Sequence, residues 1–366
     1  MPRDFIATFN VERLRILDEE GNADESLLPD LQEAEIRRLY ELLVLSRTFD
    51  SRALSLQREG RIGTYPSILG QEASQVGSAF ALEGSEWIFP SFRETAMFIT
   101  LGYPLHLLFR YWGGDERGQK IPDNLNIFPI CVSVATQIPH AVGAAMGGKV
   151  RGDNRPAVCY FGDGSTSKGD FHEGLNLAGV FQLPVVFICQ NNQWAISVSV
   201  KRQTAAATLA QKAIAYGFTG VQVDGNDVFA VLLAAREALA KAKGGGGATL
   251  IECVTYRISD HTTADDSARY RSVEEVEVWR RRDPILRLER FMAKKGLLGD
   301  AYAKETAAKA LRGIDEAVRL AESTPPPDPV EILDHVAASL TPRQKRQREE
   351  MGLTFASDDE GLTSQE

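Results

Sequence analysis

Short apolar runs alternate with helical segments through the middle third of the chain, and this alternation restricts the fold more than any other feature of the sequence. The runs have the length and the β-branched and aromatic content of buried strands. Strands that alternate with helices form βαβ units around a parallel sheet. We expect strands at 157–161, 185–190, 220–223 and 249–256, and helices at 138–150, 171–181, 205–216 and 227–243. The sequence therefore predicts an α/β fold, with a parallel sheet flanked by helices.

The segments on either side of this region predict the domain organisation. Residues 1–30 are expected to form an N-terminal arm, because residues 9–14 alternate as a strand does and a polar turn follows them. Residues 31–345 are expected to form one domain that begins with a long helix at 29–59 and ends in a helical part at about 276–345. The polar loops are predicted at 113–128 and 257–275. The remaining residues, 346–366, are expected to be a disordered polar tail.

Composition and charge exclude several classes of protein. With 366 residues, 43% of them hydrophobic, the chain can bury a large core. A formal net charge of -9 disfavours a nucleic-acid partner, because affinity for a phosphate backbone comes from clustered Lys and Arg. No segment has the apolar length of a signal peptide or a membrane span, which disfavours a membrane partner. The four cysteines are widely spaced, as reduced core thiols would be, and we expect a cytoplasmic protein.

Polar residues at the ends of two successive predicted strands carry the strongest functional signal. Asp163 lies between two glycines directly after the first of these strands, and Asn192 follows the next one. Carboxyl ends of parallel strands form the crevice where ligands bind in such sheets. Asp163 and Asn192, with the backbone carbonyl of Trp194, could supply three hard oxygen ligands to Mg²⁺. The backbone N–H groups of Gly164 and Ser165, at a helix start, would suit a diphosphate.

Each of these motifs alone is more often a simple turn or loop, but together they resemble the thiamin diphosphate signature. The resemblance extends over residues 10–350 to the alpha subunits of the decarboxylating component of 2-oxoacid dehydrogenase complexes. The matching stretches are Gly60-Arg61-Ile62-Gly63, Gly70-Gln71-Glu72-Ala73, Pro90-Ser91-Phe92-Arg93-Glu94, Ala135-Thr136-Gln137-Ile138-Pro139, Val223-Asp224-Gly225-Asn226-Asp227 and His261-Thr262-Thr263-Ala264-Asp265-Asp266. The family resemblance implies a thiamin diphosphate-binding fold with thiamin diphosphate and Mg²⁺ as cofactors.

The same resemblance implies roles for residues outside the Asp163 motif. An aromatic-Arg pair that binds the diphosphate in the family falls on Phe92 and Arg93, although Phe92 replaces the usual Tyr and lacks its hydroxyl. The backbone of Val132 and Val134 matches the atoms that hold the aminopyrimidine. Without the resemblance, this valine run would predict a buried strand.

The loop after the last predicted strand carries the catalytic candidate. His261 matches a family histidine on a mobile loop beside the thiazolium, with Arg257 just upstream as a further cofactor contact. A histidine can move protons near neutral pH or stabilise an anion through a hydrogen bond.

The family resemblance also implies partners. No acidic residue of this chain falls in a family motif for activating the pyrimidine ring, so a beta subunit is expected to supply that glutamate in an α₂β₂ heterotetramer. The acyl group would then pass to a lipoyl-bearing transacetylase core.

The resemblance implies a small 2-oxoacid as the substrate, and two such substrates fit the sequence. Segments 165–171, 201–204 and 208–213 are similar to bacterial pyruvate-type subunits, whereas 135–143, 223–230 and 269–272 are also similar to branched-chain subunits. Pyruvate is the leading prediction. Two more remote alternatives are another Mg²⁺-diphosphate-binding enzyme, which would usually show a Gly-rich Lys loop, and a noncatalytic scaffold subunit, which would have lost the ligands.

Overall fold

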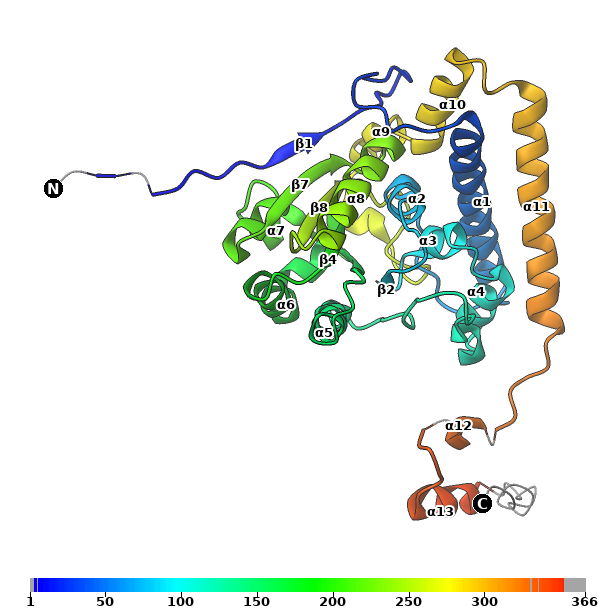
Figure 1. Cartoon of the computed structure of the whole chain (residues 1–366). Helices are drawn as coiled ribbons and strands as arrows, with labels where there is room; N and C mark the ends of the chain where they lie inside the picture. The colour runs from blue at the N-terminus through cyan, green and yellow to red at the C-terminus, as the bar shows by residue number, and fades with distance from the viewer. Residues whose placement is uncertain (1–2, 5, 330, 335, 352–366) are drawn as a thin grey trace. The chain divides into compact units, whose positions relative to one another are not determined.

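A computed structural model describes residues 3–4, 6–329, 331–334 and 336–351 of the chain. The chain divides into two compact units, Met1–Ala321 and Glu322–Glu366. The first unit contains the sheet and the helices that cover it (Figure 1). Within the described parts of the chain, no helix is long and apolar enough to cross a membrane.

Six parallel strands form the central sheet, in the order β1-β7-β8-β4-β3-β2. The strands are β1 (Glu12–Leu14), β2 (Trp87–Phe89), β3 (Ala157–Gly162), β4 (Val185–Asn191), β7 (Thr219–Asp224) and β8 (Thr249–Val254). In register, Gly162 of β3 pairs with Gln190 of β4, and Asn191 pairs with Val254 of β8. The last residues of these three strands therefore meet at one edge of the sheet. The prediction of a parallel α/β sheet is confirmed.

Helices cover both faces of the sheet (Figure 1). The α-helices of the first unit are α1 (Glu33–Arg58), α2 (Glu72–Phe80), α3 (Thr95–Thr100), α4 (Leu105–Trp112), α5 (Gln137–Val150), α6 (Gly169–Val180), α7 (Val200–Gln203), α8 (Val228–Lys243), α9 (Val273–Arg280), α10 (Pro284–Lys294) and α11 (Asp300–Ser323). The 3₁₀ turns are η1 (Glu116–Gln119), η2 (Asp163–Ser167), η3 (Ala210–Tyr216) and η4 (Ser267–Arg269), and a small hairpin joins β5 (Trp194–Ala195) to β6 (Val198–Ser199). The second unit has α12 (Glu331–Asp334) and α13 (Pro342–Glu350).

Successive residues of each strand belong to two different cores, because side chains alternate across a sheet. In β3, Val158 and Tyr160 pack in the core formed with α1, α2, α8 and α10. Cys159 and Phe161 pack in the opposite core, formed with α5 and α6. Both faces are thus apolar, as expected for a parallel sheet covered on both sides. The four cysteines are free thiols, three of them fully buried, as predicted.

The predicted elements of the middle third are present except for the helix at 205–216, which is wrong in its first half. Residues 205–209 are not helical, and only η3 follows. Thr208 and Gln211 bond reciprocally: the Gln211 N–H donates to Thr208 Oγ1 at 3.1 Å, and the Thr208 N–H donates to Gln211 Oε1 at 3.1 Å. These two bonds hold Thr208 outside the turn, whose N-cap residue is Leu209.

Both ends of the chain differ in extent from the predicted segments. In the arm, only β1 joins the sheet, as an edge strand beside β7. At the other end, 346–350 complete helix α13, so the segment expected as a polar tail begins in a helix. Its residues 352–366 lie outside the described residues.

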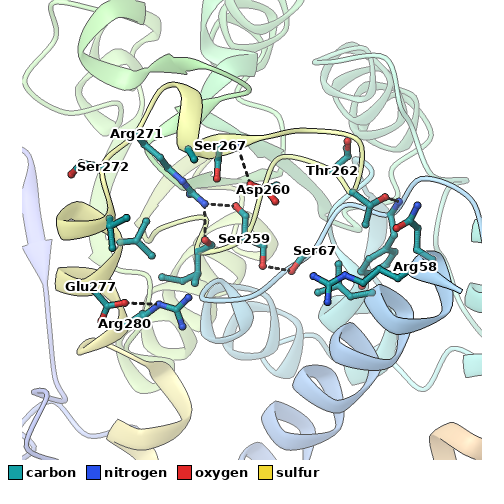
Figure 2. A pocket seen from close by; sticks show the side chains of 18 residues that line it. Arg58, Ser67, Ser259, Asp260, Thr262, Ser267, Arg271, Ser272, Glu277 and Arg280 are labelled. Atoms are coloured by element: carbon teal, nitrogen blue, oxygen red, sulfur yellow. Dashed lines mark hydrogen bonds and ion pairs between the residues drawn. The ribbon is translucent and has the colours of Figure 1, made fainter.

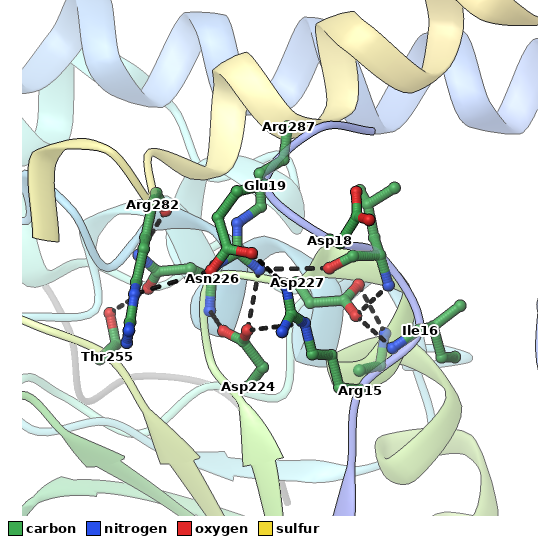
Figure 3. Close-up of polar contacts among 12 residues, drawn as sticks. Arg15, Ile16, Asp18, Glu19, Asp224, Asn226, Asp227, Thr255, Arg282 and Arg287 are labelled. Atoms are coloured by element: carbon green, nitrogen blue, oxygen red, sulfur yellow. Dashed lines mark hydrogen bonds and ion pairs between the residues drawn. The ribbon is translucent and has the colours of Figure 1, made fainter. Parts of the chain in front are cut away.

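A buried polar cluster fixes the N-terminal segment to the end of β7 (Figure 3). The Asp227 carboxylate accepts the backbone N–H groups of Ile16 and Leu17, both at 2.6 Å. It also caps helix α8, whose first free N–H groups donate to it at 3.0 and 3.1 Å. Arg287, almost fully buried, bridges Asp224 at 2.8 Å and Glu19 at 3.2 Å. One carboxylate thus holds the start of α8 and the segment that leads from β1.

Replacing Asp227 by alanine is therefore expected to destabilise the chain by about 2–4 kcal/mol. Loss of the helix cap accounts for about 1 kcal/mol, and the two buried arm N–H groups lose their acceptor. The stability of Asp227→Asn should lie between those of wild type and Asp227→Ala. Its remaining oxygen can still cap α8, but its NH₂ faces the backbone N–H groups of the arm. Urea unfolding of the full chain measures both variants. A loss below 1 kcal/mol in Asp227→Ala would show that solvent or a shift of the arm replaces these bonds.

Candidate functional site

The ends of β3 and β4, together with His261 and Thr262 of the loop after β8, line a cavity of about 620 Å³. The predicted site residues that line it are Phe92, Arg93, Val132, Val134, Asp163, Gly164, Ser165, Asn192, Trp194 and His261. Arg257, which follows β8, is fully buried behind this wall and contacts both His261 and the carbonyl of Trp194. The structure thus brings together residues that are far apart in the sequence. Their roles toward a cofactor remain predictions.

The oxygen atoms predicted as metal ligands lie at the ends of β3 and β4. Asp163 is 1% exposed, and burial raises its pKa to about 6. Its Oδ2 atom accepts the Nε2–H of Gln203 at 2.6 Å. Asn192 Oδ1 accepts the backbone N–H of Trp194 at 3.2 Å, and its NH₂ donates to Gln71 at 3.0 Å. Since no cluster of three His, Cys, Asp or Glu side chains occurs among the described residues, an ion here would need amide or carbonyl oxygens, which Mg²⁺ accepts.

Gly164 lies where its backbone comes close to the β5 segment. A Cβ atom at Gly164 would lie 2.8 Å from the Cβ of Ala195, so a side chain there would force the β5–β6 hairpin away from the site. The glycine after Asp163 is therefore required by packing as well as by the predicted ligand.

Two buried guanidinium groups face each other across His261. Arg93 donates from Nη1 to the carbonyl of Ser67 at 2.7 Å and from Nη2 to the carbonyl of His261 at 2.7 Å. Arg257 donates to the carbonyl of Ile196 at 2.8 Å, and its Nε–H has no acceptor among the described residues. Burial and the nearby Arg257 charge lower the pKa of Arg93 to about 10. Two desolvated cations without a bonded carboxylate favour an anionic ligand.

His261 is held neutral between these cations. Its Nδ1 atom lies 3.1 Å from Arg93 Nη2 and 3.3 Å from Arg257 Nη1, so Nδ1 is the acceptor and the ring proton is assigned to Nε2. Burial, followed by the charges of Arg93 and Arg257, lowers the pKa of His261 to about 3. The imidazole can donate a hydrogen bond through Nε2.

Phe92 contacts its neighbours through its ring. The ring lies edge-on to His261 with centroids 6.0 Å apart, and the Arg93 guanidinium carbon lies 5.4 Å from its centroid. The ring therefore packs beside the Arg93–His261 pair, where a tyrosine would add a hydroxyl.

The segment with Val132 and Val134 is not the buried strand that its composition alone predicts. It belongs to no strand, and the two side chains are 60% and 42% exposed. Ala135 has φ 72°, a left-handed conformation that breaks an extended run immediately before α5. The two valines consequently line the cavity from a loop.

A chain of buried amides and one carboxyl group was not predicted from the sequence. Glu94 Oε1 accepts the Nε2–H of Gln190 at 2.7 Å, and Gln190 Oε1 accepts the Nε2–H of Gln75 at 2.8 Å. Gln75 also donates to the carbonyl of Arg93 at 2.8 Å. Burial raises the pKa of Glu94 to about 7. The sequence carries a sign of this chain of hydrogen bonds, because Gln190 is a polar residue near the end of an otherwise apolar strand and Glu94 follows Arg93.

A second cavity, of about 430 Å³, lies behind the loop that carries His261 (Figure 2). Thr262 lines both cavities, so this loop forms the wall between them. Arg271 holds the loop by donating to the carbonyls of Ile258 at 2.7 Å and Ser259 at 2.9 Å, and Ser259 contacts Ser67 at 3.2 Å.

Asp50, on α1, holds the segment at Ser67 and Ile68 beside these cavities. Its ionisation makes the unfolding free energy of the chain depend on pH. Its carboxylate accepts the Ile68 N–H at 2.8 Å and the Ser67 hydroxyl at 2.6 Å, and burial raises its pKa from 3.8 to about 6. A raised acid pKa in the folded state means that its stability contribution is complete below pH 3.8 and is lost as pH rises through 6.

Between pH 4 and pH 7, wild type should therefore lose about 2 kcal/mol of unfolding free energy more than Asp50→Asn, whose side chain stays neutral. Denaturant unfolding of both proteins at several pH values measures the difference, and shared titrations cancel. A constant difference over this range would contradict the raised pKa of Asp50.

The fold and site define an α/β protein with a cavity at the carboxyl edge of its sheet, where a carboxylate and two buried arginines could bind a metal-chelated anion. The sequence matches the family described as Dehydrogenase E1 component over residues 40–330, and the chain belongs to this family. These enzymes are oxidoreductases that depend on thiamin diphosphate. The family predicted from the sequence is confirmed.

Two relatives illustrate the range of the family. The chain is 40% identical to the 3-methyl-2-oxobutanoate dehydrogenase subunit alpha of Mycobacterium tuberculosis over 98% of both chains. It is 42% identical to the pyruvate dehydrogenase E1 component subunit alpha of Staphylococcus aureus, over 86% of this chain and 85% of that one.

Proposed function

We propose that this chain is the alpha subunit of an enzyme that decarboxylates pyruvate oxidatively with thiamin diphosphate and Mg²⁺ and transfers the acetyl group to a lipoyl group. The observation that supports the proposal best is the presence of the Asp163 carboxylate and the Arg93 guanidinium in the lining of one cavity, with the buried Arg257 in contact with His261 at its wall. A metal ion suits the carboxylate, and diphosphate oxygens suit the guanidinium groups.

The residues present fit this cofactor. Asp163, Asn192 and the carbonyl of Trp194 would hold Mg²⁺. Arg257, which contacts the Trp194 carbonyl and His261, keeps a buried Nε–H with no acceptor among the described residues. The N–H groups of Gly164 and Ser165 start η2 at the same edge. When bound, thiamin diphosphate supplies the electron sink that accepts the electron pair left by departing carbon dioxide.

His261 would act as a neutral hydrogen-bond donor in this reaction. Arg93 and Arg257 occupy its Nδ1 side, which leaves the Nε2–H to stabilise an oxygen that gains negative charge. The two arginines therefore set the tautomer that the proposed role requires.

A beta subunit would complete the site. Among the described residues that line the cavity, the carboxylates are Asp163 and Glu94. Asp163 is assigned to the metal, and Glu94 is bonded to Gln190 and to the Arg93 N–H. The acid that activates the pyrimidine would then come from the beta subunit of an α₂β₂ heterotetramer, and the acetyl group would pass to a lipoyl-bearing transacetylase core.

The branched-chain alternative has specific support, because the relative from Mycobacterium tuberculosis is named for 3-methyl-2-oxobutanoate and covers almost the whole chain. We expect kcat/KM of the assembled enzyme to be larger for pyruvate than for 3-methyl-2-oxobutanoate, on the basis of the segments around Ser165 and Gln203. Steady-state rates on both substrates decide between them. A larger value for the branched substrate would reverse the assignment.

A further inference from the structure

Gln203 connects the segment after Asn192 to the carboxylate of Asp163. It is the last residue of α7, and its Nε2–H donates to Asp163 Oδ2 at 2.6 Å and to the carbonyl of Val198 at 3.1 Å. The β5–β6 hairpin and a bond from Val200 N–H to the Gln193 carbonyl, at 2.9 Å, close the segment on itself. The segment, which already lines the cavity with Trp194, Ala195 and Ile196, is thus also bonded to the Asp163 carboxylate through Gln203.

The amide of Gln203 can take only one orientation here. If its oxygen and nitrogen were exchanged, Oε1 would face the Asp163 carboxylate and the Val198 carbonyl, which are both acceptors. In the orientation present, Oε1 is buried and has no hydrogen-bond partner among the described residues. A buried acceptor without a donor costs about 1–3 kcal/mol. The bond to Asp163 is therefore kept at a cost in stability, as is typical of functional sites.

The bond from Gln203 makes the two carboxylate oxygens of Asp163 inequivalent. Oδ2 accepts the Gln203 side chain, whereas no side chain of the described residues donates to Oδ1, so Oδ1 is the oxygen available to a cation. Carboxylates that bind metals are usually oriented by a hydrogen bond from a neighbouring side chain, and removing that neighbour typically costs 10–100-fold in metal affinity. The Gln203 amide, whose N–H stabilises the charged carboxylate without competing as a ligand, suits this role.

We propose that Gln203 is a positioning residue for the metal site: by holding Asp163 Oδ2 it directs Oδ1 to the cation. The inference rests on the proposed function, because it takes Asp163 as a Mg²⁺ ligand. A purely structural alternative is that Gln203 only ties α7 to the domain.

Calorimetric titration of thiamin diphosphate into the full chain assembled with its beta subunit, at a series of Mg²⁺ concentrations, tests the proposal. Gln203→Ala removes the donor, and Gln203→Met removes it with little change in shape, which provides a second variant if the alanine protein does not fold. Lys201→Ala, an exposed position on the same helix, is the matched control.

Both Gln203 variants should need about 10–100-fold more Mg²⁺ for half-maximal cofactor affinity, and saturating Mg²⁺ should restore wild-type affinity. The control should match wild type. Two results would overturn the proposal: an unchanged Mg²⁺ requirement in both variants, or a loss of cofactor affinity that persists at saturating Mg²⁺, which indicates the structural alternative. A wild-type protein whose binding of thiamin diphosphate ignores Mg²⁺ would instead overturn the metal assignment of Asp163.

Discussion

Replacing Asp163 by alanine is expected to abolish the thermal stabilisation that Mg²⁺ and thiamin diphosphate give the chain. A ligand at 100 times its Kd stabilises the folded state by about 2.7 kcal/mol, and the variant should show none of this. The fold should persist, because Asp163 lies in a turn after β3 and its buried carboxylate, with a pKa raised to about 6, is itself unfavourable when charged. Without ligand, the variant should melt no lower than wild type at pH 8.

Thermal melting with and without the two ligands measures the effect. Asp123→Ala, at an exposed loop position, is the matched control and should retain the full shift. Equal stabilisation of wild type and Asp163→Ala would place the ion elsewhere.

The sheet could be predicted because its strands and helices are specified by local patterns. The run from Ala157 to Gly162 is apolar on both faces, which is typical of a covered parallel strand. Two predictions from local pattern were wrong where side-chain bonds or backbone conformation override it. Bonds between Thr208 and Gln211 hold Thr208 outside the turn η3, and at Ala135 a left-handed backbone ends the valine run.

The site was predictable to the extent that it is built at strand ends. Asp163 and Asn192 follow β3 and β4, so the parallel topology alone brings them together. Gln203 and Glu94 could not be placed in the same way, because Gln203 ends the short helix α7 and Glu94 precedes α3, and no periodic pattern fixes the path of the irregular segments that lead to them. The tautomer of His261 likewise depends on two arginines that converge only in the folded chain.

The exposed rim of the cavity indicates that this chain is only part of the site. Val132, Val134 and Ile196 all line the cavity, and they are 60%, 42% and 55% exposed. Ile196 also has a positive φ of 54°, which is strained for a β-branched residue. Apolar side chains gathered beside a polar site are typical of a surface that a partner covers. A beta subunit would both bury them and bring the missing acid.

The purified chain alone is therefore expected to decarboxylate neither pyruvate nor 3-methyl-2-oxobutanoate at a measurable rate, however well folded it is. The two carboxylates of its cavity are already committed, Asp163 to Gln203 and the proposed metal, and Glu94 to Gln190. Lack of a positioned acid or base typically costs about 10²–10⁴ in rate.

Turnover should appear when the cognate beta subunit is added and should saturate near equimolar chains. Carbon dioxide release and reduction of an artificial acceptor measure it, with Glu94→Gln as a control that should leave the isolated chain equally inactive. Substantial turnover by the alpha chain alone, lost in Glu94→Gln, would instead assign the activating acid to this chain.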